Sequence, residues 1–303
     1  MQLLRATLLL ASALVLAHAG PSAAQSGRPE RKTKDAAVKP PAAAAPALKR
    51  TTSRQEVRRL GHGGRLTLYG APVGSITVEG WTRGEVEVTA DIELRADTEE
   101  ELARLAAVND FVLDDDFDHV RVMTTGTHDR KFMKRAARDF PKKLLSMPWR
   151  IDYRVKIPTN CDLEIYAGSG ALNFSGFEGA LRLNAGEAAP ASFTLTGGDV
   201  EATLARGSLT LRVPARGWRG RGASFRVVEG DITLELPAGF SGDVNAEVLR
   251  VGQVESTYEG LAPRERTKQT GRQLLGRAGA GGAVLSLTVG DGTIRVRQEG
   301  VRQ

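Results

Sequence analysis

The protein has 303 residues, with 42 Lys and Arg against 36 Asp and Glu, which gives a formal net charge of +6. Its single cysteine excludes an intramolecular disulfide framework and a cysteine-rich metal site. Aromatic residues make up only 5% of the chain, which argues against a stacking surface for single-stranded nucleic acid.

Residues 1–24 have the pattern of a secretory signal peptide, with Arg5 before an apolar stretch at residues 8–17 and small residues after it. The apolar stretch is too short to span a bilayer as a stable helix, and an uncleaved membrane anchor is the alternative. Residues 25–59 are rich in Pro and Ala and cannot bury enough apolar surface to offset the entropy of ordering. We therefore predict an exported protein, periplasmic, surface-bound or secreted, with a disordered basic linker at residues 25–59.

The charges are unevenly distributed along the chain. Residues 28–59 carry a net charge of +7, residues 60–129 carry −10, residues 130–156 carry +8, and residues 157–303 are neutral overall. A protein that follows a phosphate backbone is expected to show a basic face on its folded body, which this distribution does not indicate. We therefore expect no nucleic-acid partner.

The first half of the folded region combines short strands with one helix. Thr98 and Glu101 form a capping-box pattern, after which Leu102, Leu105 and Ala106 supply the apolar stripe of a short helix. Alternation of apolar and polar residues predicts six short strands. Of these, the strands at residues 111–113 and 120–122 form either a hairpin or two further layers of a stack. The six strands are at residues 65–69, 74–78, 85–88, 92–94, 111–113 and 120–122.

Three aspartates, Asp114, Asp116 and Asp118, alternate as at the start of a calcium-binding loop. That loop needs a glycine at its sixth position and a glutamate at its twelfth, where this sequence has His119 and Thr125. We therefore expect a solvated turn here and no metal site.

Residues 131–149 form the most distinctive segment. A helix here would collect apolar side chains on one side and basic side chains on the other. Such a helix can bind an anionic lipid or polysaccharide surface, or it can cover the open end of a strand stack, and the covering role is favoured because an open end exposes edge backbone. The apolar residues are Phe132, Met133, Ala136, Ala137 and Phe140. The candidate contacts to an anionic surface are Lys131, Lys134, Arg135, Arg138, Lys142 and Lys143.

From residue 151 onward the chain repeats a glycine, a small or acidic residue, and an apolar–polar–apolar triplet. The repeat begins at Gly170, Gly179, Gly198, Gly207, Gly230, Gly242 and Gly292. Residues 191–200 match residues 223–232 at an offset of 32, which predicts a unit of three short strands every ~30 residues. We therefore predict an all-β fold, a β-solenoid or β-helix-like stack of short glycine-started strands with one short helix and a basic helical insert near residues 97–150. An antiparallel β-sandwich is the alternative.

These motifs resemble the bacterial putative-adhesin β-repeat family, a domain family of unknown function. The similarity rests on residues 74–81, 153–158 and 231–237 and on the glycine-rich residues 279–282 before the final strand. It covers residues 60–299 and implies a β-helix-like fold in an exported or envelope protein. The resemblance brings no catalytic residues, and the basic insert departs from the family pattern.

No motif with a catalytic mechanism is present, so we expect no catalytic, cofactor-binding or metal-binding residues. A polysaccharide-active enzyme would need to bring together carboxylates such as Glu164, Asp199, Glu201 and Asp231. The single cysteine, Cys161, is expected to be a small buried residue. We predict an exported, non-enzymatic scaffold of the cell envelope, an adhesin or interaction protein whose partner is an envelope polymer, a protein or an anionic lipid surface. The alternative is a polysaccharide-active enzyme or a polysaccharide-binding protein on a β-helix.

Overall fold

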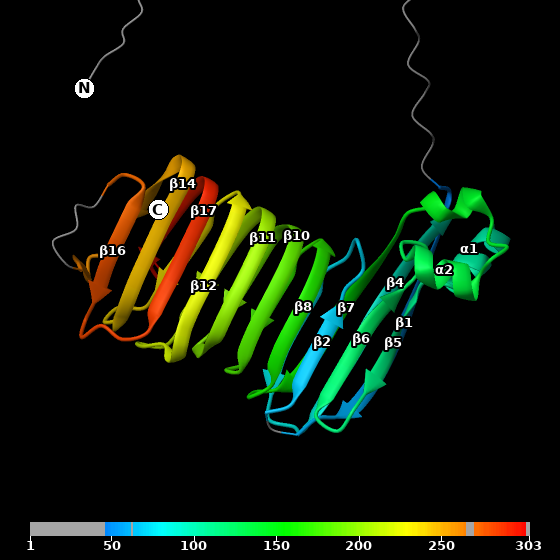
Figure 1. Ribbon diagram of the computed structural model, residues 1–303, viewed down its shortest axis with the longest axis horizontal. Helices are drawn as coiled ribbons and strands as arrows, with labels where there is room; N and C mark the ends of the chain where they lie inside the picture. Colours follow the sequence, from blue (N-terminus) through cyan, green and yellow to red (C-terminus); the bar gives the residue numbers. More distant parts are fainter. Residues whose placement is uncertain (1–45, 62, 265–269, 301–303) are drawn as a thin grey trace, which may run out of the picture. The chain divides into compact units, whose positions relative to one another are not determined.

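The computed structural model describes residues 46–61, 63–264 and 270–300 (Figure 1). The predicted signal peptide and the first part of the predicted linker lie outside these residues. The described chain consists mainly of strands, so the predicted all-β class is confirmed. Its helical elements are α1 (Glu99–Ala106), α2 (Arg130–Ala136) and the 3₁₀ turn η1 (Lys142–Ser146).

Backbone pairing arranges the strands into two faces. The first face runs in the order β5 (Asp110–Asp115), β6 (His119–Thr125), β2 (Arg65–Tyr69), β8 (Asp162–Ser169), β10 (Ala180–Thr194), β11 (Gly197–Arg212), β12 (Arg219–Glu229), β17 (Val284–Gln298), β14 (Gly242–Ser256), β16 (Gln273–Ala278) and β15 (Leu261–Pro263). The second face runs in the order β1 (Leu48–Arg59), β4 (Glu85–Ala96), β7 (Trp149–Pro158), β3 (Ile76–Trp81), β9 (Leu172–Ser175), β10, β11, β13 (Ile232–Leu236), β17 and β14.

The long strands β10, β11, β14 and β17 take part in both faces. The first half of β11 pairs with β12 and its second half pairs with β13, and β17 pairs with the same two strands. The pairing therefore closes on itself around a shared interior.

Strands in the middle of the stack are parallel. Among the described strands, antiparallel pairs occur only towards the two ends of the stack, where β1, β4 and β7 pair in turn, β5 pairs with β6, and β16 pairs with β14 and β15. The alternative of an antiparallel sandwich is therefore wrong for the middle of the fold, while the predicted hairpin of β5 and β6 is confirmed.

The spacing of the layers differs from the prediction. Leu181 pairs with Val200, 19 residues further on, and Val200 pairs with Ala223, 23 residues further on. Each turn of the chain thus contributes two strands, one to each face, in place of the predicted three strands every ~30 residues. Phe193 and Phe225, which align at the offset of 32, lie on opposite faces, and their rings meet edge-on with centroids 5.1 Å apart.

Strand β1 shows that the predicted linker is wrong for residues 48–59. These residues pair with β4 along their whole length. The prediction failed because the row of β1 that faces the interior carries polar and charged side chains in place of apolar ones. After Leu48, the row consists of Arg50, Thr52, Arg54, Glu56 and Arg58, which lie opposite buried residues of β4.

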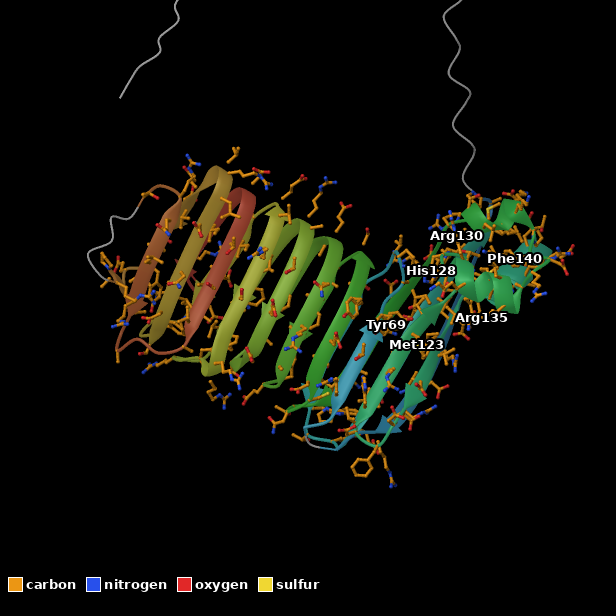
Figure 2. All side chains as sticks on the ribbon, viewed as in Figure 1. Tyr69, Met123, His128, Arg130, Arg135 and Phe140 are labelled. Carbon is orange, nitrogen blue, oxygen red and sulfur yellow. The ribbon has the colours of Figure 1, made fainter. Side chains whose placement is uncertain are left out.

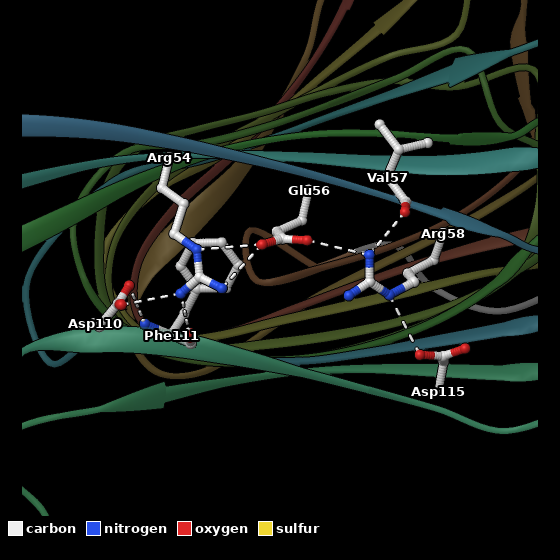
Figure 3. A network of polar contacts seen from close by, with 7 residues as sticks. All are labelled: Arg54, Glu56, Val57, Arg58, Asp110, Phe111 and Asp115. Atoms are coloured by element: carbon white, nitrogen blue, oxygen red, sulfur yellow. Dashed lines mark hydrogen bonds and ion pairs between the residues drawn. The ribbon is translucent and has the colours of Figure 1, made fainter.

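The inward arginines of β1 close the end of the stack by reaching the edge strand of the other face (Figure 3). The Arg54 guanidinium donates hydrogen bonds to the Asp110 carboxylate and to the Phe111 carbonyl oxygen, each at 2.9 Å, and lies 4.6 Å from the centre of the Phe111 ring. Arg58 binds Asp115 at 3.3 Å. Charged residues that point inward from an edge strand also oppose pairing with further strands.

Candidate functional site

The chain passes from the first face to the second through residues 127–147, which we call the basic corner. It contains α2 and η1 and lies between β6 and β7. The Asp129 carboxylate accepts hydrogen bonds from the backbone N–H groups of Phe132 and Lys131 at 3.0 and 2.8 Å, which begins α2 and lowers the pKa of Asp129.

Helix α2 ends at Ala136, so it is shorter than the predicted amphipathic helix. Phe140 precedes Pro141, a position at which helical backbone is disfavoured. Only part of the predicted apolar side is confirmed, since Met133 is buried, Phe132 and Phe140 are half-buried, and Ala136 is exposed.

The basic corner is attached firmly to the fold on one side. Met133 and Leu144 are buried. The Lys143 ammonium binds Asp97 at 3.1 Å and Glu101 at 2.9 Å, which joins η1 to α1 and lowers the pKa of Glu101. Glu101 also donates its backbone N–H to the Thr98 hydroxyl at 3.2 Å, so the predicted helix start is confirmed.

On its other side the basic corner exposes uncompensated positive charge. Six exposed basic side chains here form no ion pair with any described carboxylate. They are Arg130, Lys131, Lys134, Arg135, Arg138 and Lys142. Asp129 and Asp139 are the acidic residues within the same segment. Figure 2 shows Arg130 and Arg135 on α2, with Phe140 beside them.

Five of the six predicted contact residues therefore remain available to a partner. The sixth, Lys143, is also exposed, but its ammonium group forms ion pairs with Asp97 and Glu101. The sequence analysis missed Arg130, which directly precedes the basic run and could have been included on charge alone.

Two depressions lie on either side of Met133, Lys134 and Leu145, which line both of them. The first has a volume of about 500 Å³ and is also lined by Ala137, Arg138, Phe140 and Lys142. The second has a volume of about 440 Å³ and is also lined by Thr127, His128 and Arg130. Each depression combines apolar side chains with basic ones, a composition suited to a ligand that carries negative charge next to an apolar group.

His128 lies at the start of α2, with its ring centre 5.3 Å from that of Trp149. Burial of the ring lowers the pKa of His128 below its ordinary value. The positive charge of the basic corner at neutral pH therefore comes from its lysines and arginines.

The other residues considered from the sequence have structural partners. Arg121 binds Asp114 at 2.9 Å and Asp116 at 2.6 Å, so two of the three alternating aspartates form ion pairs. Burial raises the pKa of the Cys161 thiol to about 12, which makes it a poor nucleophile. In the part of the chain that the structure describes, no group of three or more His, Cys, Asp or Glu residues could hold a metal ion.

The carboxylates that an enzyme would have to bring together are dispersed. On the first face, Arg182 lies opposite Glu164 of β8 on one side and Glu201 of β11 on the other in the strand register, so a basic residue separates the two acids. Asp231 precedes β13 on the second face and binds Arg295 at 3.0 Å. Across residues 46–61, 63–264 and 270–300, no helix is long and apolar enough to cross a membrane.

Fold and site together define an all-β protein of stacked strands with a cationic, partly apolar corner. The sequence matches no known family profile and no curated protein. One similar solved structure is described as a putative cell adhesion protein from Clostridium sporogenes, with a TM-score of 0.43, 11% identity, and coverage of 82% of this chain and 100% of that chain. A putative adhesin from Bacteroides fragilis (TM-score 0.25, 10% identity) and a putative lipid binding protein from Parabacteroides distasonis (TM-score 0.23, 6% identity) each cover 82% of this chain and 97% of their own. These TM-scores are below 0.5, so the similarities assign no function to the basic corner.

Proposed function

We propose that the protein is an exported, non-enzymatic β-solenoid scaffold that binds an anionic membrane surface through its basic corner. The observation that carries the proposal is the joint exposure of six uncompensated basic side chains and the apolar side chains of the two depressions. Phe140 and Leu145 belong to the first depression, and Leu145 is 43% exposed.

This combination matches the chemistry of a bilayer interface. Each lysine or arginine near an anionic membrane contributes about 1 kcal/mol of attraction, and this contribution weakens as salt screens the charges. Apolar side chains among the basic ones add affinity by entering the boundary between headgroups and acyl chains. An acidic polysaccharide would use the positive charge but leave Leu145 in water, so the apolar contribution favours lipid.

Vesicle flotation tests the proposal with the purified protein. We expect the protein to float with vesicles of equimolar phosphatidylcholine and phosphatidylglycerol and to stay at the bottom of the gradient with phosphatidylcholine alone. High salt should release the bound protein. A protein that binds neither kind of vesicle would contradict a lipid-binding role. So would a protein that binds an acidic polysaccharide resin but not anionic vesicles.

A further inference from the structure

The turn between β5 and β6 displays a completely exposed phenyl ring. Phe117 lies between Asp116 and Asp118 and is the most exposed of the large apolar side chains in the described part of the chain. Turns favour Gly, Asn, Asp, Ser and Pro for conformational reasons, so the turn itself does not require a phenylalanine. A ring held in this position is available to a partner.

The ring stands in an acidic setting, which we call the acidic tip, residues 114–118. Its aspartates are Asp114, Asp115, Asp116 and Asp118. Arg121 binds Asp114 and Asp116, and Arg58 binds Asp115 at 3.3 Å. Four carboxylates against two guanidinium groups leave the tip negative, with Asp118 outside every ion pair of the described residues.

The first depression of the basic corner is complementary to this tip. Its volume of about 500 Å³ exceeds that of a phenyl ring, and Met133, Phe140 and Leu145 give it an apolar lining. Lys134, Arg138 and Lys142 line the same depression and supply the opposite charge to that of the tip. The tip and the first depression are therefore complementary in size, polarity and charge.

The tip and the basic corner lie at opposite ends of the β5–β6 hairpin, since β6 leads from one to the other (Figure 1). A chain therefore cannot place its own tip in its own depression. We infer that Phe117 of one copy enters the first depression of a second copy, so that copies join head to tail. A contact between two different surfaces of the same chain leaves a free tip and a free depression at the ends, so copies keep adding to the row unless its rotation closes it into a ring.

This inference goes beyond membrane binding and is compatible with it. Lys131 and Arg135 line neither depression, so both remain available to an anionic surface in every copy of a row. The copy at one end of the row also keeps its depression free. Inner copies would keep only these charges for the membrane, because Phe117 of the next copy would cover the apolar side chains of their first depression. Repetition of the charges along a row still raises the overall avidity.

Sedimentation velocity of the purified protein tests the head-to-tail contact. The wild type should show a weight-average mass that rises with concentration and passes beyond that of a dimer. The variant Phe117→Ala should associate about 30-fold more weakly, the loss expected for an apolar side chain of this size. Val251→Ala, which shortens a side chain 71% exposed at the other end of the stack, is the matched control and should associate as the wild type does.

A mixing experiment separates a head-to-tail contact from other modes of association. Phe117→Ala keeps an intact depression, and the double variant Lys134→Glu/Arg138→Glu keeps an intact tip. At a concentration at which the wild type associates but a contact about 30-fold weaker does not form, each should be monomeric alone, and the mixture should form one-to-one dimers that do not grow further. A monomeric wild type, unchanged association of Phe117→Ala, or a mixture of folded variants that stays monomeric would overturn the inference. Phe117→Ala should still float with anionic vesicles, so a failed inference is distinguishable from a failed membrane role.

Discussion

At the residue scale, two glycines of the sequence repeat, Gly207 and Gly230, lie where the chain passes from the first face to the second. Gly207 and Gly230 have φ angles of +133° and +140°, in a region that other residues rarely adopt. A Cβ atom on Gly230 would lie 1.8 Å from the carbonyl oxygen of Gly207, and one on Gly207 would lie 1.7 Å from that of Ala188. Successive turns thus approach each other through backbone, which leaves no room for a side chain.

We expect Gly230→Ala to lower the free energy of unfolding by at least ~2 kcal/mol, because it adds both backbone strain and a steric clash. Gly61→Ala is the matched control, since Gly61 has no atom within 4 Å of the added Cβ and no positive φ angle. Urea unfolding of both variants measures the difference. Equal stability of the two variants would show that the corner tolerates a side chain.

At the element scale, alternation identified strands whose inward row is apolar. It predicted β2, β3, β5 and β6, and it divided the single strand β4 into two pieces. It missed β1, whose inward row holds Arg54 and Arg58. The predicted spacing of about 30 residues between layers was also wrong, because the alternation of side chains along a strand does not show which strand lies beside it. Pairing partners depend on the connections between strands, which differ in length from turn to turn.

A charge ladder across three adjacent strands, β11, β13 and β17, shows how the second face is held together. Glu235 lies between Arg212 and Arg297, which bind its carboxylate at 2.9 and 2.5 Å. Burial by itself would raise the pKa of Glu235, but the hydrogen bonds from Arg297 and Arg212 outweigh it and hold the pKa below the ordinary value. A lowered pKa means that the folded state binds a proton less readily than the unfolded state does.

The ladder therefore stabilises the fold fully above pH 4.5, the ordinary value for glutamate, and this stabilisation is lost as the pH falls through the lowered pKa. We expect Glu235→Gln to lower the free energy of unfolding by about 1–2 kcal/mol near neutral pH and to reduce its decline in acid. Urea unfolding across this pH range measures both effects. Glu229→Gln, at an exposed pair with Arg206, should change little, and an equal effect of both variants would contradict the role given to the ladder.

At the scale of the whole molecule, the net charge of +6 is less informative than where the charges lie. The run of basic residues predicted a cluster, and the structure places all six predicted residues in one exposed corner, five of them without an ion pair to a described carboxylate. The sequence could not show that Lys143 is held by α1, because the packing of the insert depends on contacts with distant residues. It also favoured a covering role for the insert, which stays a prediction; Met133 and Leu144 of the insert are buried, and Arg54 and Arg58 bridge the end of the stack as well.

Binding to an anionic membrane should depend on the basic corner and not on the overall charge. A binding isotherm on vesicles of phosphatidylcholine and phosphatidylglycerol tests it most directly, with two variants of equal formal charge. Lys131→Glu/Arg135→Glu changes the basic corner, and Arg83→Glu/Arg226→Glu changes exposed arginines outside this corner that form no ion pair with a described residue. We predict at least ~30-fold weaker binding for the first variant and no comparable loss for the second. Equal weakening of both variants, or no binding by the wild type, would contradict the account.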